Sequence, residues 1–566
     1  MPHAPLHRPR RHRASLRARA ASCALLFGAA LPAAGWGAPA GPDAAAAVPA
    51  PSAPPPHGAD LGGRAPRGAQ WDAWGEARGR SEHLSDFAID ELGTPQPTGR
   101  WFETRLLAGG RYTPAPGLRL ELELEALNGR IGGDGTALGA AATADPFAYP
   151  RAAGFWDSPD RWAQVLPRKA LIGVDRPTWR ASLGAQTFTW GTGMLANAGD
   201  GDPAFGDART GSVVARAGLV ATPWRQREGR AAQGLGFVLA TDVVLRDDNA
   251  SWAEGDRVFQ GVGGLRWRLR RAELGALAVV RRQADRADPL RPADPAAPDP
   301  EGAGTTARAT PLDLYAKVQV LGAPDGLQRL ILEGELVHVR GWTDRPYIEE
   351  TVPDGALVRS VGAVLRATYE DDPLRLTARV EGGYASGDND PRDAVVRGFT
   401  MHTDHNVGII LFEQALPLLG ARAADRVADP ALMAVPPSGL RYTIPQGGVT
   451  NAIYAFPTLR WRPWVPLELR AGAVLAQGAG DVIDVYHSGI SGGWPATPGG
   501  ALIGDSAPAR GLGVELDAAI RADLPLPGAT RLQLGVEGAT WHPGPAFAGV
   551  IDDPVHALRL RAALGW

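Results

Sequence analysis

The sequence predicts an all-β fold: a transmembrane antiparallel up-and-down β-barrel of about 18 strands (16–18), with no plug domain. Three observations predict it. Many segments alternate apolar and polar residues, short turns and long loops succeed each other along the chain, and the last residues alternate up to a terminal tryptophan. Alternation with a period of two is typical of a strand with one apolar and one polar face.

The alternation is clearest from Leu118 to Ala126, where the even positions are apolar and the odd positions are charged. Comparable segments are about 8–14 residues long, and a transmembrane strand needs about 9–11. They lie at 100–112, 118–131, 167–175, 179–189, 211–222, 234–245, 258–270, 272–282, 312–321, 328–340, 358–370, 373–385, 405–412, 449–462, 466–477, 510–523, 529–541 and 556–566.

The connections between these segments fall into two classes. The tight ones are 113–117, 176–177, 270–272, 323–326, 371–372, 463–466 and 525–528. Between them lie the long loops 132–165, 190–210, 246–257, 284–310, 341–357, 386–404, 478–509 and 542–554. Outer-membrane barrels have short turns at one end and long loops at the other, whereas a soluble sandwich does not segregate its loops in this way.

The alternation of turns and loops is broken in one region. If 371–372 and 463–466 are turns at the same end, residues 386–448 begin and end at the loop end. The segment 405–412 is then a strand within a loop. A further strand near 83–92 would bring the start of the barrel back to the turn end.

The start of the chain predicts export. Residues 1–19 hold six arginines and no acid, and an apolar run follows to Leu31. Ala38-Pro-Ala40 then fits the small-x-small pattern of a cleavage site. This order is typical of a secretory signal peptide, predicted here at 1–40. Residues 41–98 are predicted to be a Pro/Ala-rich disordered tail with a transitional segment, and the barrel to occupy 99–566.

Charge and cysteine content exclude several kinds of function. The net charge is −3, and without the six arginines of the predicted signal 52 basic residues face 61 acidic ones, a balance of −9. Nucleic-acid binding is disfavoured because it needs a concentrated basic face. The only cysteine, Cys23, lies in the predicted signal, so we expect neither disulfides nor thiolate chemistry in the mature chain. We expect no cofactor.

A sheet closed into a barrel accounts for both the apolar and the charged face of each predicted strand. The apolar faces hold mainly Leu, Val and Ala and would contact lipid, while a closed barrel pairs every backbone N–H and C=O. Sixteen to eighteen strands leave an aqueous channel. The residues expected to line it are Glu121, Glu123, Glu125, Arg180, Arg266, Arg268, Glu333, Glu335, Arg379, Glu381, Arg460, Glu515, Asp517, Arg559 and Arg561. If the acidic row on 118–126 opposed the basic row on 264–270, a transverse field would select ions.

Tryptophans near the predicted strand ends indicate two aromatic girdles at the lipid headgroups. The expected members are Trp101, Trp179, Trp190, Trp224, Trp461, Trp464, Trp541 and Trp566. The alternative for these residues is ordinary capping of a β-core.

Three stretches carry resemblances to known proteins. The alternating end with Trp566 resembles the C-terminal insertion signal of bacterial outer-membrane barrels, which implies the outer membrane and its insertion machinery as partner. The stretches 183–200, with Gln186, Trp190 and Gly191, and 381–390, with Tyr-Ala-Ser-Gly-Asp388, resemble a family of uncharacterised outer-membrane barrels. More distantly they are similar to alginate-export-type channels.

The resemblance implies passage of a small polar solute, for example a saccharide, through an 18-stranded pore. The chain departs from the family pattern at Gly184-Ala185-Gln186, where members commonly carry Gly-Arg-Gln. The missing arginine removes one candidate contact for an anion. The expected function is therefore a porin-like channel with a charged, loop-narrowed lumen. The alternative is a non-conducting barrel whose long loops bind a partner or have a structural role.

Other motifs are weighed against this expectation. Asp200, Asp202 and Asp207, and also Asp388 with Asp390, could ligate calcium, but short acidic loops are usually only solvated. His402, Asp404 and His405 match no established metal spacing, so no metal site is predicted. Ser491 in Gly489–Gly493, and Ser506, fit hydrolase-like strings. They lack the strand–turn–helix context that a nucleophile elbow needs, and an enzyme is not predicted.

Overall fold

The computed structural model describes residues 69–97, 99–134, 165–208, 211–225, 234–285, 305–323, 326–344, 354–390, 393–429, 431–432, 445, 447–504 and 509–566. All of them belong to one compact unit, His57–Trp566; the other unit is Met1–Pro56. The predicted signal peptide and the Pro/Ala-rich residues up to 68 lie outside the described residues.

The described residues form one 20-stranded sheet, in which β8 and β15 have two residues each and 18 strands are long. The strands are β1 Gln70–Leu84, β2 Arg100–Ala115, β3 Leu118–Gly133, β4 Val165–Arg176, β5 Trp179–Thr187, β6 Val213–Ala221, β7 Leu235–Asp247, β8 Ala250–Ser251, β9 Arg257–Arg268, β10 Ala272–Ala284, β11 Thr306–Leu321, β12 Gln328–Thr343, β13 Ala356–Asp371, β14 Leu376–Ala385, β15 Val395–Val396, β16 Ala452–Trp464, β17 Leu467–Gly478, β18 Gly511–Pro525, β19 Arg531–Pro543 and β20 Val555–Gly565.

In the described residues, helices are short and lie in the connections between strands. They are α1 Leu416–Ala428, α2 Val485–Ile490, a π-helical turn Leu411–Ala415 that runs into α1, and 3-10 turns at Trp252–Glu254 and Pro545–Phe547. Within the described ranges, we find no helix with the length and apolar character that a membrane span requires.

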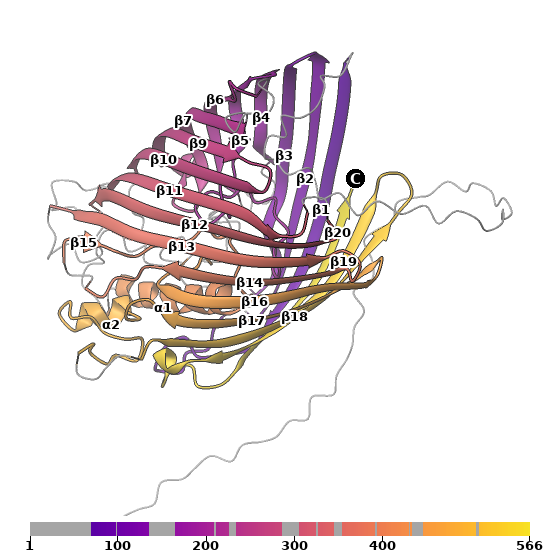
Figure 1. Ribbon diagram of the computed structural model, residues 1–566. Helices are drawn as coiled ribbons and strands as arrows, with labels where there is room; N and C mark the ends of the chain where they lie inside the picture. The colour runs from indigo at the N-terminus through magenta and orange to yellow at the C-terminus, as the bar shows by residue number, and fades with distance from the viewer. Residues whose placement is uncertain are drawn as a thin grey trace, which may run out of the picture. The chain divides into compact units, whose positions relative to one another are not determined.

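The sheet closes on itself. Each long strand pairs antiparallel with the next one along the chain, and β20 pairs with β1 from Glu76 opposite Gly565 to Leu84 opposite Ala557. Figure 1 shows β1 beside β20. The Gly75 and Trp566 backbones exchange hydrogen bonds of 3.0 and 3.1 Å, and a Cβ at Gly75 would lie 2.2 Å from the Trp566 ring. The prediction of a closed antiparallel barrel of about 18 strands is confirmed.

Two predicted boundaries are wrong. The barrel begins at Gln70, not at 99, because β1 pairs along its whole length with β2. Its lipid-facing positions hold mostly small residues, such as Ala77 and Gly79, so the alternation is weak in the sequence. The segment 405–412 is not a strand: it runs through turns into the π-helical turn. Strand β1 replaces it in the count.

The outer and inner faces differ as the alternation predicts. Outward-facing side chains such as Leu122, Leu365 and Leu560 are half exposed, and their neighbours in sequence turn inward. We call the end with the hairpin between β4 and β5 the turn end, and the end with the long connections the loop end. The β5–β6 loop and the β14–β16 segment fold into the barrel from the loop end, where they contact inner-face residues such as Glu335 and Glu515.

Candidate functional site in the barrel lumen

All of the charged residues expected to line the lumen lie on the inner face. On β3, for example, Leu120 and Leu122 are exposed on the outside, while Glu121, Glu123 and Glu125 are buried inside. The same alternation of exposed and inward-facing residues occurs on the other strands. It places the remaining charged residues on the inner face: Arg180, Arg266, Arg268, Glu333, Glu335, Arg379, Glu381, Arg460, Glu515, Asp517, Arg559 and Arg561.

The acidic and basic rows each have oppositely charged partners on a neighbouring strand. Glu123 pairs with Arg168 and Lys169 on the neighbouring strand β4, both at 3.1 Å. On the other row, Arg266 and Arg268 both pair with Glu273 across the β9–β10 hairpin. Glu123 is therefore paired with cations of the neighbouring strand, and Arg266 and Arg268 share one carboxylate, because cross-strand partners lie closer than the opposite wall.

The β5–β6 loop crosses the lumen and is held by arginines from several strands. Asp202 lies 3.0 Å from Arg460 and from Arg470, and 2.8 Å from Arg521. Burial within the walls would raise the pKa of Asp202, but these three guanidinium groups hold it well below its usual range. The side chain stays 55% exposed to the space inside the barrel.

A second carboxylate of this loop is held by the strands at the closure of the barrel. Asp207 contacts Arg78 and Arg80 of β1 at 3.3 and 3.5 Å and Arg561 of β20 at 3.0 Å. Burial again opposes ionisation, yet Arg561, Arg78 and Arg80 together lower the pKa of Asp207. These contacts anchor the loop on both sides of the β1–β20 closure.

The third loop carboxylate completes the anchoring. Asp200 contacts Arg168 of β4 at 2.9 Å, and Thr192 donates both its N–H and its hydroxyl to Glu335 of β12. Asp200, Asp202 and Asp207, considered as calcium ligands, are therefore arginine partners, and Asp388 lies 3.5 Å from Arg397. No group of three or more His, Cys, Asp or Glu that could hold a metal occurs in the described part of the chain.

The β14–β16 segment is held differently, by one carboxylate and an apolar cluster. Glu515 of β18 accepts the backbone N–H groups of Ile409, Ile410 and Leu411 at 2.6, 2.8 and 2.8 Å. Next to it, Glu413 contacts Arg559 of β20 at 2.7 Å.

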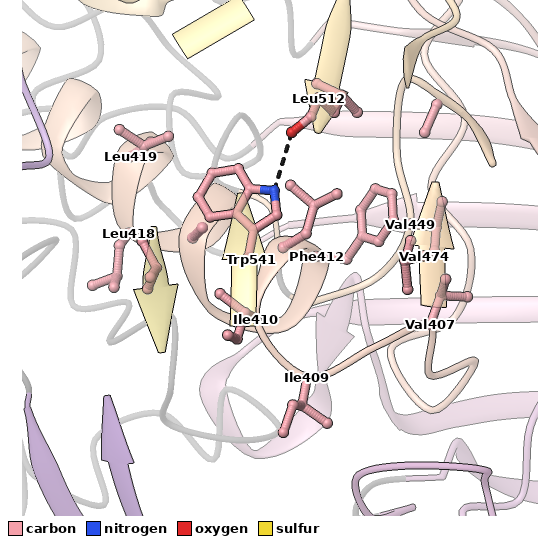
Figure 2. Close-up of a cluster of buried hydrophobic side chains, with 14 of the residues drawn as sticks. Val407, Ile409, Ile410, Phe412, Leu418, Leu419, Val449, Val474, Leu512 and Trp541 are labelled. Atoms are coloured by element: carbon pink, nitrogen blue, oxygen red, sulfur yellow. Dashed lines mark hydrogen bonds between the residues drawn. The ribbon is translucent and has the colours of Figure 1, made fainter. Parts of the chain in front are cut away.

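Apolar side chains of this segment pack against the inner wall. Ile409, Ile410 and Phe412 are almost completely buried, together with Trp541 of β19. Figure 2 shows the Trp541 ring among them, with its indole N–H donating to the carbonyl of Leu512 at 3.1 Å. The interior of this barrel therefore contains an apolar core besides its charges.

Residues 402–406 join the two inward segments. The His402 N–H donates to the Met194 carbonyl, and the Gly211 N–H donates to Asp404 Oδ2, both at 2.8 Å. The Asn406 amide donates to the Asp207 carbonyl at 3.1 Å. We call residues 402–406, with these contacts, the septum.

Cavities lie on the two sides of the septum. The larger, about 630 Å³, lies towards the loop end; its wall includes Gln260, Arg281, Gln283 and Val279, and His402 borders it. The smaller, about 180 Å³, lies deeper and contacts Arg366, Glu381 and Thr458 of the wall, with Asp404, His405 and Asn406 of the septum. A solute passing along the barrel would meet the septum between the two cavities.

The predicted aromatic girdles are only partly placed at the outer surface. Trp179, Trp461, Trp464 and Trp566 are exposed on the outside, and Trp224 packs beside Phe237. Trp101, Trp190 and Trp541 are buried inside the barrel, so their assignment to a girdle is wrong. Trp101 and Trp541 share the parity of the charged positions Glu103 and Glu537, a signal already present in the sequence.

Residues of the hydrolase-like and metal-like motifs make hydrogen bonds within the protein. Ser491 donates its hydroxyl to the carbonyls of Ser488 and Trp494. Ser506 lies outside the described residues. His402 accepts the Asp404 N–H at 3.0 Å, whereas His405 points to Glu381 and Tyr454 at 3.0 and 3.1 Å. The two imidazoles therefore have separate sets of partners.

Sequence reasoning missed three arginines that hold the β5–β6 loop: Arg78, Arg80 and Arg470. Their inward parity could be read along each strand. Their shared partners could not, because these depend on how distant strands are arranged around the closed barrel.

No family model and no curated protein matches the sequence. Solved structures similar to the chain include two Pseudomonas aeruginosa proteins, OccK11 (OpdR), 11% identical with a TM-score of 0.43, and OccK1 (OpdK), 11% identical with a TM-score of 0.44. They cover 88% of this chain and 95% and 98% of their own. The Vibrio cholerae outer membrane protein OmpT with loop L8 deleted is 9% identical, has a TM-score of 0.33 and covers 88% of this chain and 100% of its own. The strand pairing itself establishes the fold: this chain forms a closed antiparallel barrel of 18 long strands.

Proposed function

We propose that the protein is an outer-membrane, porin-like channel for passive passage of a small polar solute, including a short saccharide. The observation that carries the proposal is the cavity of about 630 Å³ inside a closed barrel whose outer face is apolar. A barrel of this strand number is wide enough for an aqueous channel. Lipid would contact the outer face, and solute the inner one.

The walls of the larger cavity suit a solute with hydroxyl or amide groups. Gln260, Gln283 and Asn249 offer amide groups, and the pairs Arg216–Asp242 and Arg281–Asp247 offer charges that neutralise each other. Val262, Leu277 and Val279 add an apolar strip to the same wall. Such a lining combines orientation by hydrogen bonds with contact for the apolar face of a ring.

The second candidate is a non-conducting barrel with a structural or partner-binding role. The septum favours it, since residues 402–406 connect both inward segments between the two cavities. Thr403 also donates its N–H and hydroxyl to Asp248 at the end of β7, both at 3.0 Å. These contacts would have to open before a solute of any size could pass.

Single-channel conductance in planar bilayers separates the two candidates. The wild-type protein is compared with the double variant His402→Ala/Asp404→Ala, which removes the septum's contacts to Ser212 and Gly211. The matched control is Asp523→Asn at the turn end of β18, where the side chain accepts a hydrogen bond from Gln533, away from the septum.

Discrete openings of the wild type, with larger openings in the double variant, support the channel. A silent wild type with a conducting double variant supports a barrel that the septum closes. If neither protein conducts, although heat-modifiable migration on a gel shows that both are folded as barrels, the channel proposal is contradicted.

A further inference from the structure

Four arginines form a patch on the outer face of the barrel. Arg282 of β10, Arg308 of β11, Arg340 of β12 and Arg359 of β13 are all exposed and lie within a few residues of the loop end of their strands. We call them the outer arginine patch. Their neighbours on the same face, Val280, Leu312, Leu336 and Leu357, are exposed apolar residues.

The patch brings like charges together. Arg282 lies directly opposite Arg308 in the β10–β11 register, and Arg340 lies directly opposite Arg359 in the β12–β13 register. Like charges directly opposite each other destabilise a strand pair. Arg340 donates its Nε–H to the His338 imidazole at 3.0 Å, and this partner brings no negative charge. Within the described ranges no carboxylate pairs with any of the four.

The inner face of the same strands handles charge in the opposite way. Arg281, next to Arg282 in sequence, pairs with Asp247, and Arg366 of β13 pairs with Glu381. The arginines on the inside thus have carboxylate partners, and those on the outside do not. An external anion would supply what the outer face lacks.

The surface also has a place for such a group. A depression of about 400 Å³ lies on β12 and β13, lined by His338, Arg340, Gly341, Leu357, Val358 and Arg359. Guanidinium groups bind phosphate oxygens through two parallel hydrogen bonds, and basic clusters beside apolar surface bind lipid headgroups. Leu357 and the leucines nearer the middle of the strands would contact acyl chains.

We propose that the outer arginine patch binds the phosphate groups of a phosphorylated glycolipid in the leaflet at the loop end. The inference rests on the proposed function only for placing the barrel in an outer membrane with its long loops outward. Two phosphates could engage the pairs Arg282–Arg308 and Arg340–Arg359, and thereby relieve the repulsion within each pair.

Native mass spectrometry of the detergent-solubilised protein tests this inference. The probes are bisphosphorylated lipid A, the same lipid A without its phosphates, and inorganic phosphate. The test variant is Arg282→Gln/Arg308→Gln/Arg340→Gln/Arg359→Gln. The matched control is Arg270→Gln/Arg271→Gln, which removes exposed arginines from the turn end of β9 and β10.

We expect the wild type and the control to retain bisphosphorylated lipid A and the test variant to lose at least about tenfold in affinity, because it lacks all four guanidinium groups that would pair with the phosphates. Equal retention by the test variant, equal binding of the dephosphorylated lipid, or inorganic phosphate binding as tightly as the lipid would overturn the inference. Heat-modifiable migration on a gel shows whether each variant is folded. If the test variant does not fold, the Arg340→Lys/Arg359→Lys variant replaces it. This variant keeps the two positive charges but loses the bidentate geometry of the guanidinium groups, and it should bind the lipid more weakly than the wild type.

The two proposals can fail separately. Lipid binding is measured in detergent and needs no conductance, so a silent barrel that retains lipid A leaves this inference standing. A conducting barrel without preference for the phosphorylated lipid rejects this inference alone.

Discussion

The two inward segments differ in the balance of contacts that hold them. The β5–β6 loop is anchored by ion pairs, since its acids Asp200, Asp202 and Asp207 each meet arginines of the wall. The β14–β16 segment is anchored by burial of Ile409, Ile410 and Phe412, and by one carboxylate that accepts its backbone N–H groups. One segment could rearrange if its charges change, whereas the other needs an apolar surface to be exposed.

This difference has consequences for how the lumen would respond to its surroundings. Ion pairs weaken with salt when they contact water, and Asp202 is 55% exposed. Apolar burial is little affected by salt at moderate concentration. We therefore expect the β5–β6 loop to be the more responsive segment and the β14–β16 segment to be the more rigid one. The predictions below test this contrast, from the largest expected effect to the smallest.

Glu515→Ala should have the largest effect. It leaves the buried N–H groups of Ile409, Ile410 and Leu411 without their acceptor, at a cost on the order of 5 kcal/mol in the free energy of unfolding. Guanidinium unfolding followed by tryptophan fluorescence measures it. Glu515→Gln keeps one acceptor oxygen and should lose less; equal losses for the two variants would contradict the proposed role.

Trp541→Ala should follow, with a loss of about 3–5 kcal/mol, because a fully buried ring and its hydrogen bond to Leu512 are removed. The control is Trp461→Ala, which truncates a tryptophan that is 45% exposed on the outside. If the two variants lost the same stability, the apolar core would not be what holds the β14–β16 segment.

Asp202→Asn should cost less, about 2 kcal/mol, because Arg460, Arg470 and Arg521 lose a shared carboxylate but the last two keep Glu468 and Glu537. In contrast to Trp541→Ala, its cost should shrink as salt rises. Unfolding at low and high sodium chloride checks this, and a salt-independent cost would contradict the electrostatic anchoring.

The smallest effect concerns pH and α1. The Arg426 guanidinium, which hydrogen-bonds Glu91 at 2.9 Å, lowers the pKa of Glu91 to about 2 from an ordinary value of 4.5. A lowered pKa means that the contact stabilises fully above 4.5 and is lost as pH falls from 4.5 through about 2. For a partly exposed pair we expect about 1 kcal/mol or less.

Amide hydrogen exchange of α1 at pH 6 and pH 2.5 measures that loss. In Glu91→Gln the difference between the two pH values should shrink, since the titrating group is gone. An unchanged difference would show that another group controls the helix.

The sequence predicted the wall better than the contents of the lumen. Alternation along one strand determines which side chains share a face, so Glu121 and Arg559 could be assigned to the inside from their neighbours alone. It does not determine which distant strands meet one loop, so the arginines around Asp202 could not be foreseen. The apolar run Val407–Phe412 looked like a strand because its length and composition fit one. Only Glu515, more than a hundred residues later, shows that its N–H groups have another acceptor.

The contact between Gly75 and Trp566 constrains the order of folding. It joins two of the most distant described positions in the chain, and until it forms both β1 and β20 keep an edge of unpaired backbone groups. Contacts of such large sequence separation form late and slowly. A chain interrupted before Val555 would therefore stay an open, curved sheet. Its two edge strands would have unpaired backbone groups that can pair with other chains. An alanine at Gly75 would place its methyl group against the Trp566 ring and hinder the pairing of β1 with β20.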